Sequence, residues 1–344
     1  MEDDLDANYE LVSDIDASLT VRANNVRGFD PVGNGQYERF QFTGSFDGNH
    51  HTITGLRINQ TTDGVYTAAG MFGVTGSGAT ITNVTLRDLT VTGGRRVGGL
   101  VGFNTGGTIT NVTVSGNVTG NTSVGGVIGQ NAGTIQNTAA SVGVTSKDGF
   151  GGVGGLVGSN GQYGDGGIIQ NVTASGDVTG RQFVGGLIGY NDNTVKNALA
   201  SGSVNGSEEV GGLVGRNYRL SGLIQNASAS GSVTGESEVG GLVGSNFVGA
   251  ATTQNAKASG NVTGDTNVGG LAGFNGGTVQ SALASGSVNG SEEVGGLVGS
   301  NTETVEQSYF DTEATGQSTS AGSATGLTTA QMQGQAAAEN MDGF

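Results

Sequence analysis

The stretch that decides the fold is Val97–Gly102, which reads VGGLVG. A paired glycine inside an apolar run fits a nucleotide-binding loop, a membrane-helix contact or part of a protein core. Variants of the stretch recur at steps of 26 to 31 residues, and such a period indicates architecture rather than a single site. The eight copies begin at Val97, Val124, Val153, Val184, Val210, Val239, Val268 and Val294.

The chemistry around the repeat argues against the two other readings. A phosphate-binding loop would need Gly-Lys-Ser/Thr, and a dinucleotide site would need one glycine motif followed by a helix. No stretch reaches the ~18 consecutive apolar residues of a membrane span. We therefore interpret VGGLVG as one wall of a repeated coil.

Each repeat carries two further β-prone pieces, exemplified by TITNVTVSG (108–116) and NVTG (117–120). The pieces are too short and too rich in Gly and β-branched residues to form helices. Stacked repeats can pair each piece with its copy in the next unit and so bury a common core. The sequence predicts an all-β parallel β-helix, or β-solenoid, of about 12 coils with about 28 residues and three short strands per coil.

Two columns of asparagine accompany the repeat. An Asn at a corner tolerates left-handed backbone, and its amide can bond to the Asn of the next coil. The valines should fill a narrow interior. The sequence does not decide whether Leu100 points into this interior or towards the surface. The two columns contain Asn104, Asn131, Asn160, Asn191, Asn217, Asn246, Asn275 and Asn301, and then Asn83, Asn111, Asn137, Asn171, Asn197, Asn226 and Asn255.

The two ends of the chain depart from the repeat. Residues 1–66 are predicted to be N-terminal capping coils, and residues 67–310 to be the solenoid repeats, because an open solenoid core needs atypical ends. Residues 311–344 are predicted to be a Gly/Ser/Thr-rich linker with a short C-terminal helix. The chain shows no signal peptide at its start, and we expect it to be a fragment or a mature form.

The composition restricts the partners. The net charge is −16, with 29 acidic against 13 basic residues, so nucleic-acid binding and attraction to anionic membranes are not expected. An acidic chain poor in lysine fits a protein from a high-salt environment, and equally a secreted repeat protein with ordinary solubility charge. The absence of cysteine excludes disulfides and thiolate metal sites.

A family resemblance rests on FTGSFDGNHHTITGLRIN (42–59), followed by the GGLVGxN and TIxN units. This combination resembles the GLUG-repeat proteins of bacterial and archaeal surfaces, which include adhesin-like chains and the non-catalytic region of some IgA-cleaving metallopeptidases. DGNHHTITGL also resembles an early coil of pectate-lyase-like β-helices, which implies a right-handed solenoid. The zinc-binding HExxH of the peptidases is absent, and His50 and His51 are the only histidines.

An enzymatic alternative rests on the N-terminal region. Polysaccharide lyases with β-helix folds use aspartate clusters with calcium and a basic residue. Turn formation and surface pairing are simpler explanations for the same residues here. The region contains Asp14, Asp16, Asp30 and Asp47 together with Arg22, Arg27, Arg39 and Arg57.

A ridge of acidic residues precedes the later VGG walls. Stacked carboxylates of neighbouring coils could hold Ca²⁺, or they could form a solvated edge that needs salt for screening. We expect no other cofactor and no catalytic residue. The candidate metal ligands are Glu208, Glu209, Glu236, Glu238, Asp265, Glu292 and Glu293.

These observations together predict a non-enzymatic, extracellular structural or adhesive module of a cell-surface protein or fibre. Its partners would be cell-surface glycans or proteins, or copies of itself in a fibre. The alternatives are a carbohydrate-active β-helix enzyme that uses the Asp/Arg region, and binding of a crystal surface by threonine rows. The rows are short, because Gln136 and Gln170 interrupt them.

Overall fold

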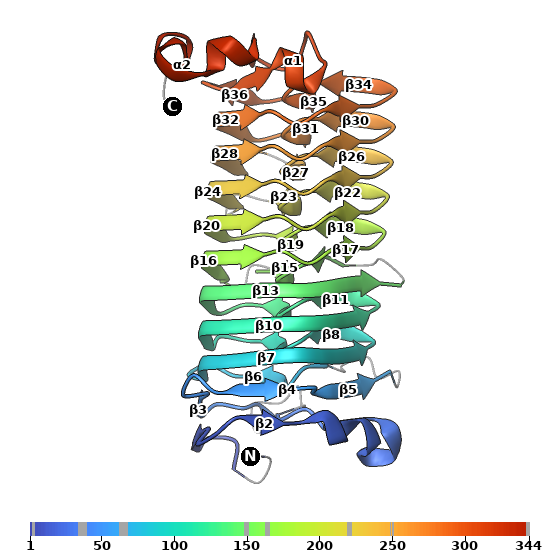
Figure 1. Ribbon diagram of the computed structural model, residues 1–344, viewed down its shortest axis with the longest axis vertical. Helices are drawn as coiled ribbons and strands as arrows, with labels where there is room; N and C mark the ends of the chain where they lie inside the picture. The colour runs from blue at the N-terminus through green and yellow to red at the C-terminus, as the bar shows by residue number, and fades with distance from the viewer. Residues whose placement is uncertain are drawn as a thin grey trace.

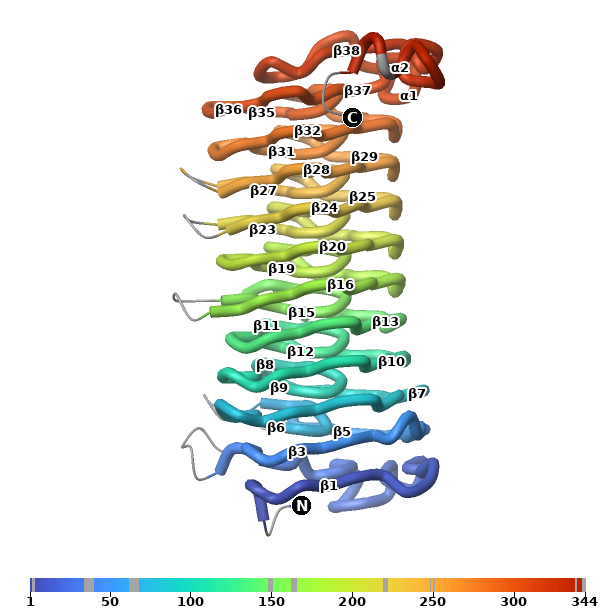
Figure 2. Tube along the Cα trace, turned by 90° about the vertical axis from the view of Figure 1, so that its left-hand side faces the viewer, coloured from blue at the N-terminus to red at the C-terminus, as the bar shows by residue number. Residues whose placement is uncertain are grey.

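The chain winds into a β-solenoid whose coils stack along one long axis (Figures 1 and 2). The computed structural model describes residues 1, 4–33, 40–61, 68–147, 151–161, 166–218, 222–247, 249 and 251–341. The strands form three sheets, called here the first, second and third walls in the order that each coil visits them. Every pairing between named strands in the described residues is parallel, so like positions of successive coils meet, as the sequence predicts.

The first wall carries the TIxN and xVTG pieces of each coil. In the three coils that cover residues 80–146 of this wall both pieces form one long strand, whereas in the coils before and after them breaks divide the pieces into shorter strands. Its strands are β1 (Asn8–Glu10), β2 (Ile15–Asp16), β3 (Ser45–Asp47), β4 (Thr52–Thr54), β5 (Arg57–Gln60), β7 (Thr80–Gly93), β10 (Thr108–Gly120), β13 (Thr134–Ser146), β16 (Ile168–Ala174), β17 (Val178–Thr179), β20 (Thr194–Ala200), β21 (Val204–Asn205), β24 (Leu223–Ala229), β25 (Val233–Thr234), β28 (Thr252–Ala258), β29 (Val262–Thr263), β32 (Thr278–Ala284), β33 (Val288–Asn289), β36 (Thr304–Glu306), β37 (Tyr309–Asp311) and β38 (Thr325–Leu327).

The VGGLVG motif supplies the two other walls. The second wall contains β8 (Arg95–Gly98), β11 (Thr122–Gly125), β14 (Val153–Gly154), β18 (Gln182–Gly185), β22 (Glu208–Gly211), β26 (Ser237–Gly240), β30 (Thr266–Gly269) and β34 (Glu292–Gly295). The third wall contains β6 (Phe72–Thr75), β9 (Val101–Asn104), β12 (Ile128–Asn131), β15 (Val157–Asn160), β19 (Ile188–Asn191), β23 (Val214–Tyr218), β27 (Val243–Phe247), β31 (Ala272–Asn275) and β35 (Val298–Asn301).

The paired glycines form the corner between the second and third walls. A Cβ on Gly98 would lie 2.2 Å from the carbonyl oxygen of Val101, and a Cβ on Gly99 would lie 2.5 Å from that of Gly126. No side chain fits at either position. Because the corner resets the alternation of the strands, Val97 and Leu100 are both completely buried, which resolves the face of Leu100.

The predicted number of coils is wrong, although the solenoid itself is confirmed. The sequence predicts about 12 coils, and the structure has about eight. In the described residues the second wall begins only at β8 and ends at β34, so the terminal segments lack a strand in one wall. Dividing the whole chain by the repeat length counted these segments as full coils.

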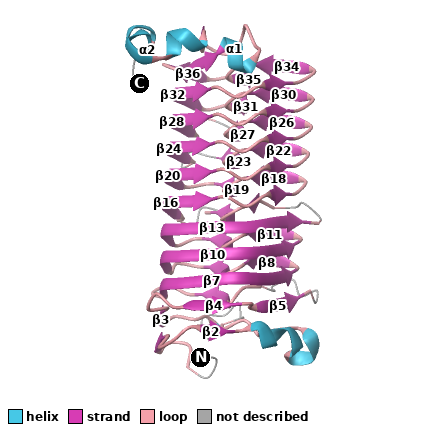
Figure 3. Ribbon diagram, viewed as in Figure 1, coloured by secondary structure: helices cyan, strands magenta, loops and turns pink. Residues whose placement is uncertain are grey.

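The described helices lie at the two ends of the solenoid (Figure 3). The N-terminal end carries the 3-10 helices η1 (Ser18–Arg22) and η2 (Asn24–Val26). The C-terminal end carries α1 (Thr312–Thr315), the 3-10 helix η5 (Thr329–Met332) and α2 (Gly334–Asn340). Thr328 caps η5, because its hydroxyl oxygen accepts from the backbone N–H of Gln331.

Candidate functional surfaces

Two ladders of asparagine run along the solenoid, as the sequence predicts. In the interior ladder, the amide of Asn104 donates to Asn131 Oδ1 at 2.9 Å, and the same bond repeats from coil to coil. In the outer ladder the side chains lie at an exposed corner with left-handed backbone, and Asn111 donates to Asn83 at 3.1 Å. The interior ladder consists of Asn104, Asn131, Asn160, Asn191, Asn217, Asn246, Asn275 and Asn301.

The acidic ridge is spread over three neighbouring columns of the second wall. Glu208 and Glu292 share one column, but Ser237 and Thr266 separate them. Glu236 and Asp265 occupy the preceding turn, where the backbone N–H of Asp265 donates to the carbonyl of Glu236 at 2.9 Å. The third column contains Glu209, Glu238 and Glu293, each with positive φ.

The ridge does not gather its carboxylates at one point. Across the described ranges, no three histidine or acidic side chains lie close enough together to hold a metal ion. The carboxylate of Glu208 accepts from the Gln182 side-chain amide at 3.0 Å, and that of Glu236 accepts from the Ser207 hydroxyl at 3.3 Å. Calcium binding at the ridge stays a prediction, tested below by thermal melting.

One ridge residue is deeply buried. Glu209 is 5% exposed, and both of its carboxylate oxygens accept from the guanidinium of Arg216 on the third wall. Burial raises the pKa of Glu209 to about 7, because desolvation of the carboxylate outweighs the opposing effect of Arg216. The carboxylates of Glu238 and Glu208 add to this upward shift.

Aromatic rings enclose the guanidinium of Arg216. It lies 4.5 Å from the ring centre of Phe183 and 4.7 Å from that of Phe247, distances at which cation–π attraction operates. Further rings continue along the third wall, with centroid separations of 5.7 to 6.2 Å. This aromatic row consists of Tyr190, Tyr218, Phe247 and Phe274.

The sequence interpretation missed Arg216 and the aromatic row. Their signal lies on both sides of the interior-ladder asparagine. Tyr190, Arg216 and Phe274 precede it in their coils, whereas Tyr218 and Phe247 follow it. Aligning the repeats on that asparagine would have revealed large side chains in an otherwise small-residue motif. Because the side chains are partly exposed, the row gives this side of the rod a distinct chemistry.

The N-terminal aspartates accept hydrogen bonds from their own turns or from the next coil. Asp14 accepts from the backbone N–H of Thr52 at 2.9 Å and contacts His51, while Asp47 accepts from the N–H of Asn49 at 2.8 Å. Those hydrogen bonds hold the pKa of Asp14 and of Asp47 below the usual value, and the bond from the backbone N–H has the largest effect.

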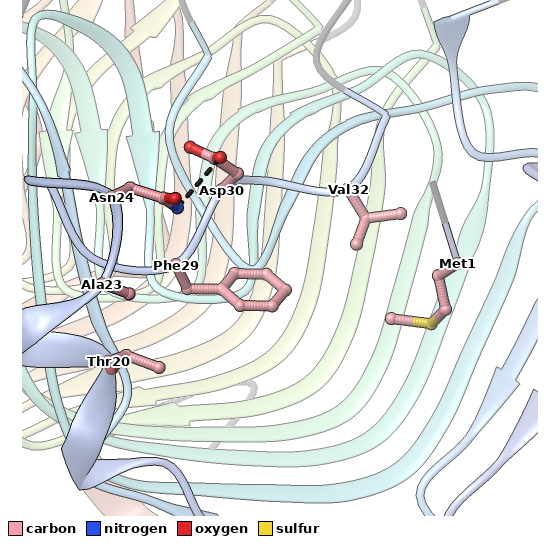
Figure 4. Close-up of a pocket in the computed structure, with 7 residues that line it drawn as sticks. All are labelled: Met1, Thr20, Ala23, Asn24, Phe29, Asp30 and Val32. Atoms are coloured by element: carbon pink, nitrogen blue, oxygen red, sulfur yellow. Dashed lines mark hydrogen bonds between the residues drawn. The ribbon is translucent and has the colours of Figure 1, made fainter. Parts of the chain in front are cut away.

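The arginines that the structure describes in this region do not pair with these carboxylates. Within the described residues, no ion pair joins the N-terminal aspartates to Arg22, Arg27 or Arg57. Arg39 lies outside the described residues. Asp30 instead accepts from the side-chain amide of Asn24 at 2.9 Å (Figure 4). The region therefore has the hydrogen bonding of a turn-rich cap.

Comparison with known proteins agrees with this architecture. The GLUG motif matches residues 93–119, 151–179 and 206–234. Halomucin of Haloquadratum walsbyi is 37% identical over 189 residues, which are 54% of this chain and 2% of halomucin. A protein described as a Gly-rich membrane protein of Evansella cellulosilytica is 36% identical over 109 residues, which are 31% of this chain and 12% of that protein.

One solved structure also aligns with the chain, at a low score. The crystal structure of a protein assigned as an immunoglobulin A1 protease from Bacteroides ovatus aligns with 97% of this chain and 81% of its own, at a TM-score of 0.46 and 19% identity.

In the described part of this chain, no helix has the length and apolar character needed to cross a membrane. The chain is a β-solenoid that carries GLUG motifs.

Proposed function

We propose that this chain is a non-enzymatic structural module of a cell-surface protein, which projects or spaces other parts of that protein and binds through its ribbed sides. The observation that carries the proposal is the unbroken interior ladder, in which a buried hydrogen bond links each coil to the next from Asn104 to Asn301. A continuous ladder inside a continuous core resists bending and separation of the coils.

The relatives support the proposed location at a cell surface. The chain is similar to halomucin and to the Gly-rich membrane protein, although it spans only a small part of each. The charge of −16 supports an origin in a salty medium, because dissolved ions screen repulsion between exposed carboxylates. Halophily and an extracellular location are parts of the same proposal.

The sides of the rod suggest two classes of partner. The aromatic row and the outer ladder offer partly exposed rings and amides, groups that can contact both glycans and proteins. Cell-surface glycans or proteins are therefore the proposed ligands, with copies of the chain as the third option. The occupied N-terminal aspartates give no specific support to the enzymatic alternative.

The location is tested with an antibody raised against the purified chain. Intact cells of the source organism should bind the antibody, and brief protease treatment of those cells should remove the signal. An antibody against a cytosolic protein is the control for cell integrity. Labelling that appears only after lysis would contradict the surface function.

The absence of catalysis is tested separately. The purified chain, with and without Ca²⁺, is incubated with a panel of neutral and acidic polysaccharides, and reducing ends and unsaturated products are measured. We expect no release above that of a heat-treated sample. Release that the Asp14→Asn substitution abolishes would replace the structural proposal with the enzymatic one.

A further inference from the structure

Asparagine followed directly by glycine is a chemically labile pair, and the chain contains five of them. Glycine has no Cβ, so its backbone nitrogen can approach the side-chain carbonyl carbon of the asparagine before it. The structure describes four of the five pairs, because Asn34 lies outside the described residues. The pairs begin at Asn34, Asn160, Asn205, Asn275 and Asn289.

The reaction of such a pair needs a glycine N–H that is free to move. A bond forms between the glycine nitrogen and the asparagine Cγ, the bond from Cγ to Nδ2 breaks, and Nδ2 leaves as ammonia with the proton of the glycine nitrogen. Water then opens the cyclic imide at either carbonyl and gives aspartate or isoaspartate. Where the glycine N–H is bonded to a neighbouring coil, the sheet must first open locally, which slows the reaction.

Two of the described pairs lie in the interior ladder and are held firmly. The backbone N–H of Gly161 donates to the carbonyl of Asn131 at 2.8 Å, and that of Gly276 donates to the carbonyl of Asn246 at 2.8 Å. The asparagine of each pair is also completely buried. Both pairs are therefore protected by the fold.

The two other pairs lie at equivalent positions of the identical stretches 198–215 and 282–299, but their surroundings differ. In the first stretch β25 lies beside β21, and the N–H of Gly206 donates to the carbonyl of Thr234 at 3.0 Å. In the second stretch β33 pairs only with β29, and the N–H of Gly290 has no partner in the described residues. Asn289 and Gly290 are both exposed, whereas Gly206 is partly covered.

The free edge at β33 results from the course of the chain itself. The chain continues past this coil into α1, which lies beyond the last coil (Figure 1). The segment that meets the edge is not a strand, because the side-chain amide of Gln317 donates to the carbonyl of Val288 at 3.0 Å. This contact satisfies the carbonyl before the pair and leaves the N–H of Gly290 free.

We propose that Asn289 is a site of spontaneous deamidation in the folded protein, whereas Asn160, Asn205 and Asn275 are protected. The product carries a negative charge three residues before Glu292 and so extends the acidic ridge. Isoaspartate also adds a methylene group to the backbone, which should loosen the pairing of β33 with β29. The site concerns the chain itself and stands whether or not the chain works at a cell surface.

The test is peptide mapping by mass spectrometry after the folded full chain is incubated in mildly alkaline buffer made with heavy-oxygen water. The incorporated oxygen separates conversion during the incubation from conversion during digestion. We expect Asn289 to convert at least about tenfold faster than Asn205, because the bond of Gly206 must first open. The two peptides are told apart just beyond the identical stretch, where one has Arg216 and the other Ser300.

The matched control is the same incubation in concentrated urea. In the unfolded chain the two asparagines should convert at equal rates, because their local sequences are identical. Equal rates in the folded chain, or faster conversion of Asn205, would overturn the proposal. Conversion of both sites in urea with none at Asn289 in the folded chain would overturn it as well, since the fold would then protect this pair too.

Discussion

The interior ladder should contribute strongly to stability, and replacement of Asn217 by alanine tests this directly. The Asn217 amide accepts from Asn191 and donates to Asn246 and to the carbonyl of Gly222. Its removal leaves Asn246 Oδ1 buried without its partner. It also takes one bond each from the Asn191 amide, which keeps its bond to Asn193, and from the Gly222 carbonyl, which keeps its bond from Thr252. The orphaned oxygen costs about 1–3 kcal/mol and each of the two lost bonds about 1 kcal/mol, so we expect a loss of about 3–5 kcal/mol.

A matched control lies at the end of the same ladder. Asn301 has one ladder neighbour, Asn275, and its side chain is partly exposed, so water can replace the lost bonds. We expect Asn301→Ala to cost about 1 kcal/mol. The assay is equilibrium urea unfolding with thermal melting, followed by circular dichroism at both ends of the transition. Equal losses for the two variants would refute the idea that a buried ladder holds the coils together.

Three further predictions follow from burial and charge. Folding raises the pKa of Glu209 from 4.5 to about 7. The free energy of unfolding should therefore fall by about 3 kcal/mol as the pH rises from about 4.5 to about 7. In pH-dependent unfolding, Glu209→Gln should flatten this loss, whereas Glu293→Gln should leave it unchanged. Val239→Asp puts an unpaired charge into the core and should lower the free energy of unfolding in urea by several kcal/mol. Thr263→Asp on the exposed face should lower it little. Similar losses for the two variants would contradict the assignment of these residues to the interior and the surface. NaCl should raise the melting temperature, and Ca²⁺ at equal ionic strength should add nothing; a large calcium shift that Glu236→Gln abolishes would make the ridge a metal site.

The repeat in the sequence was sufficient to predict the solenoid and much of its interior. The recurring valines, represented by Val97 and Val239, are buried, and both asparagine columns form hydrogen-bonded ladders. These features are predictable because stacking places identical residues next to one another. Once the period is known, each residue's neighbours above and below are known as well.

The ends were less predictable, because nothing repeats there. The coil count failed where the terminal segments lack a strand in one wall. The exposure of side chains such as Val12 and Leu19 in the first coil is likewise known only from the structure. Alternating apolar residues alone do not show whether another coil covers them.

Two identical stretches separate what the sequence determined from what the tertiary structure decided. Residues 198–215 and 282–299 have the same sequence and form the same strands and corner. Glu209 is nevertheless buried against Arg216, whereas Glu293, seven residues before Ser300, is exposed. Local sequence fixed the backbone, because β-propensity and the paired glycines act within one coil. The environment of each carboxylate depends on the side chain across the corner, Arg216 or Ser300, and on the side chains that neighbouring coils place beside it. Only the folded stack brings these groups together.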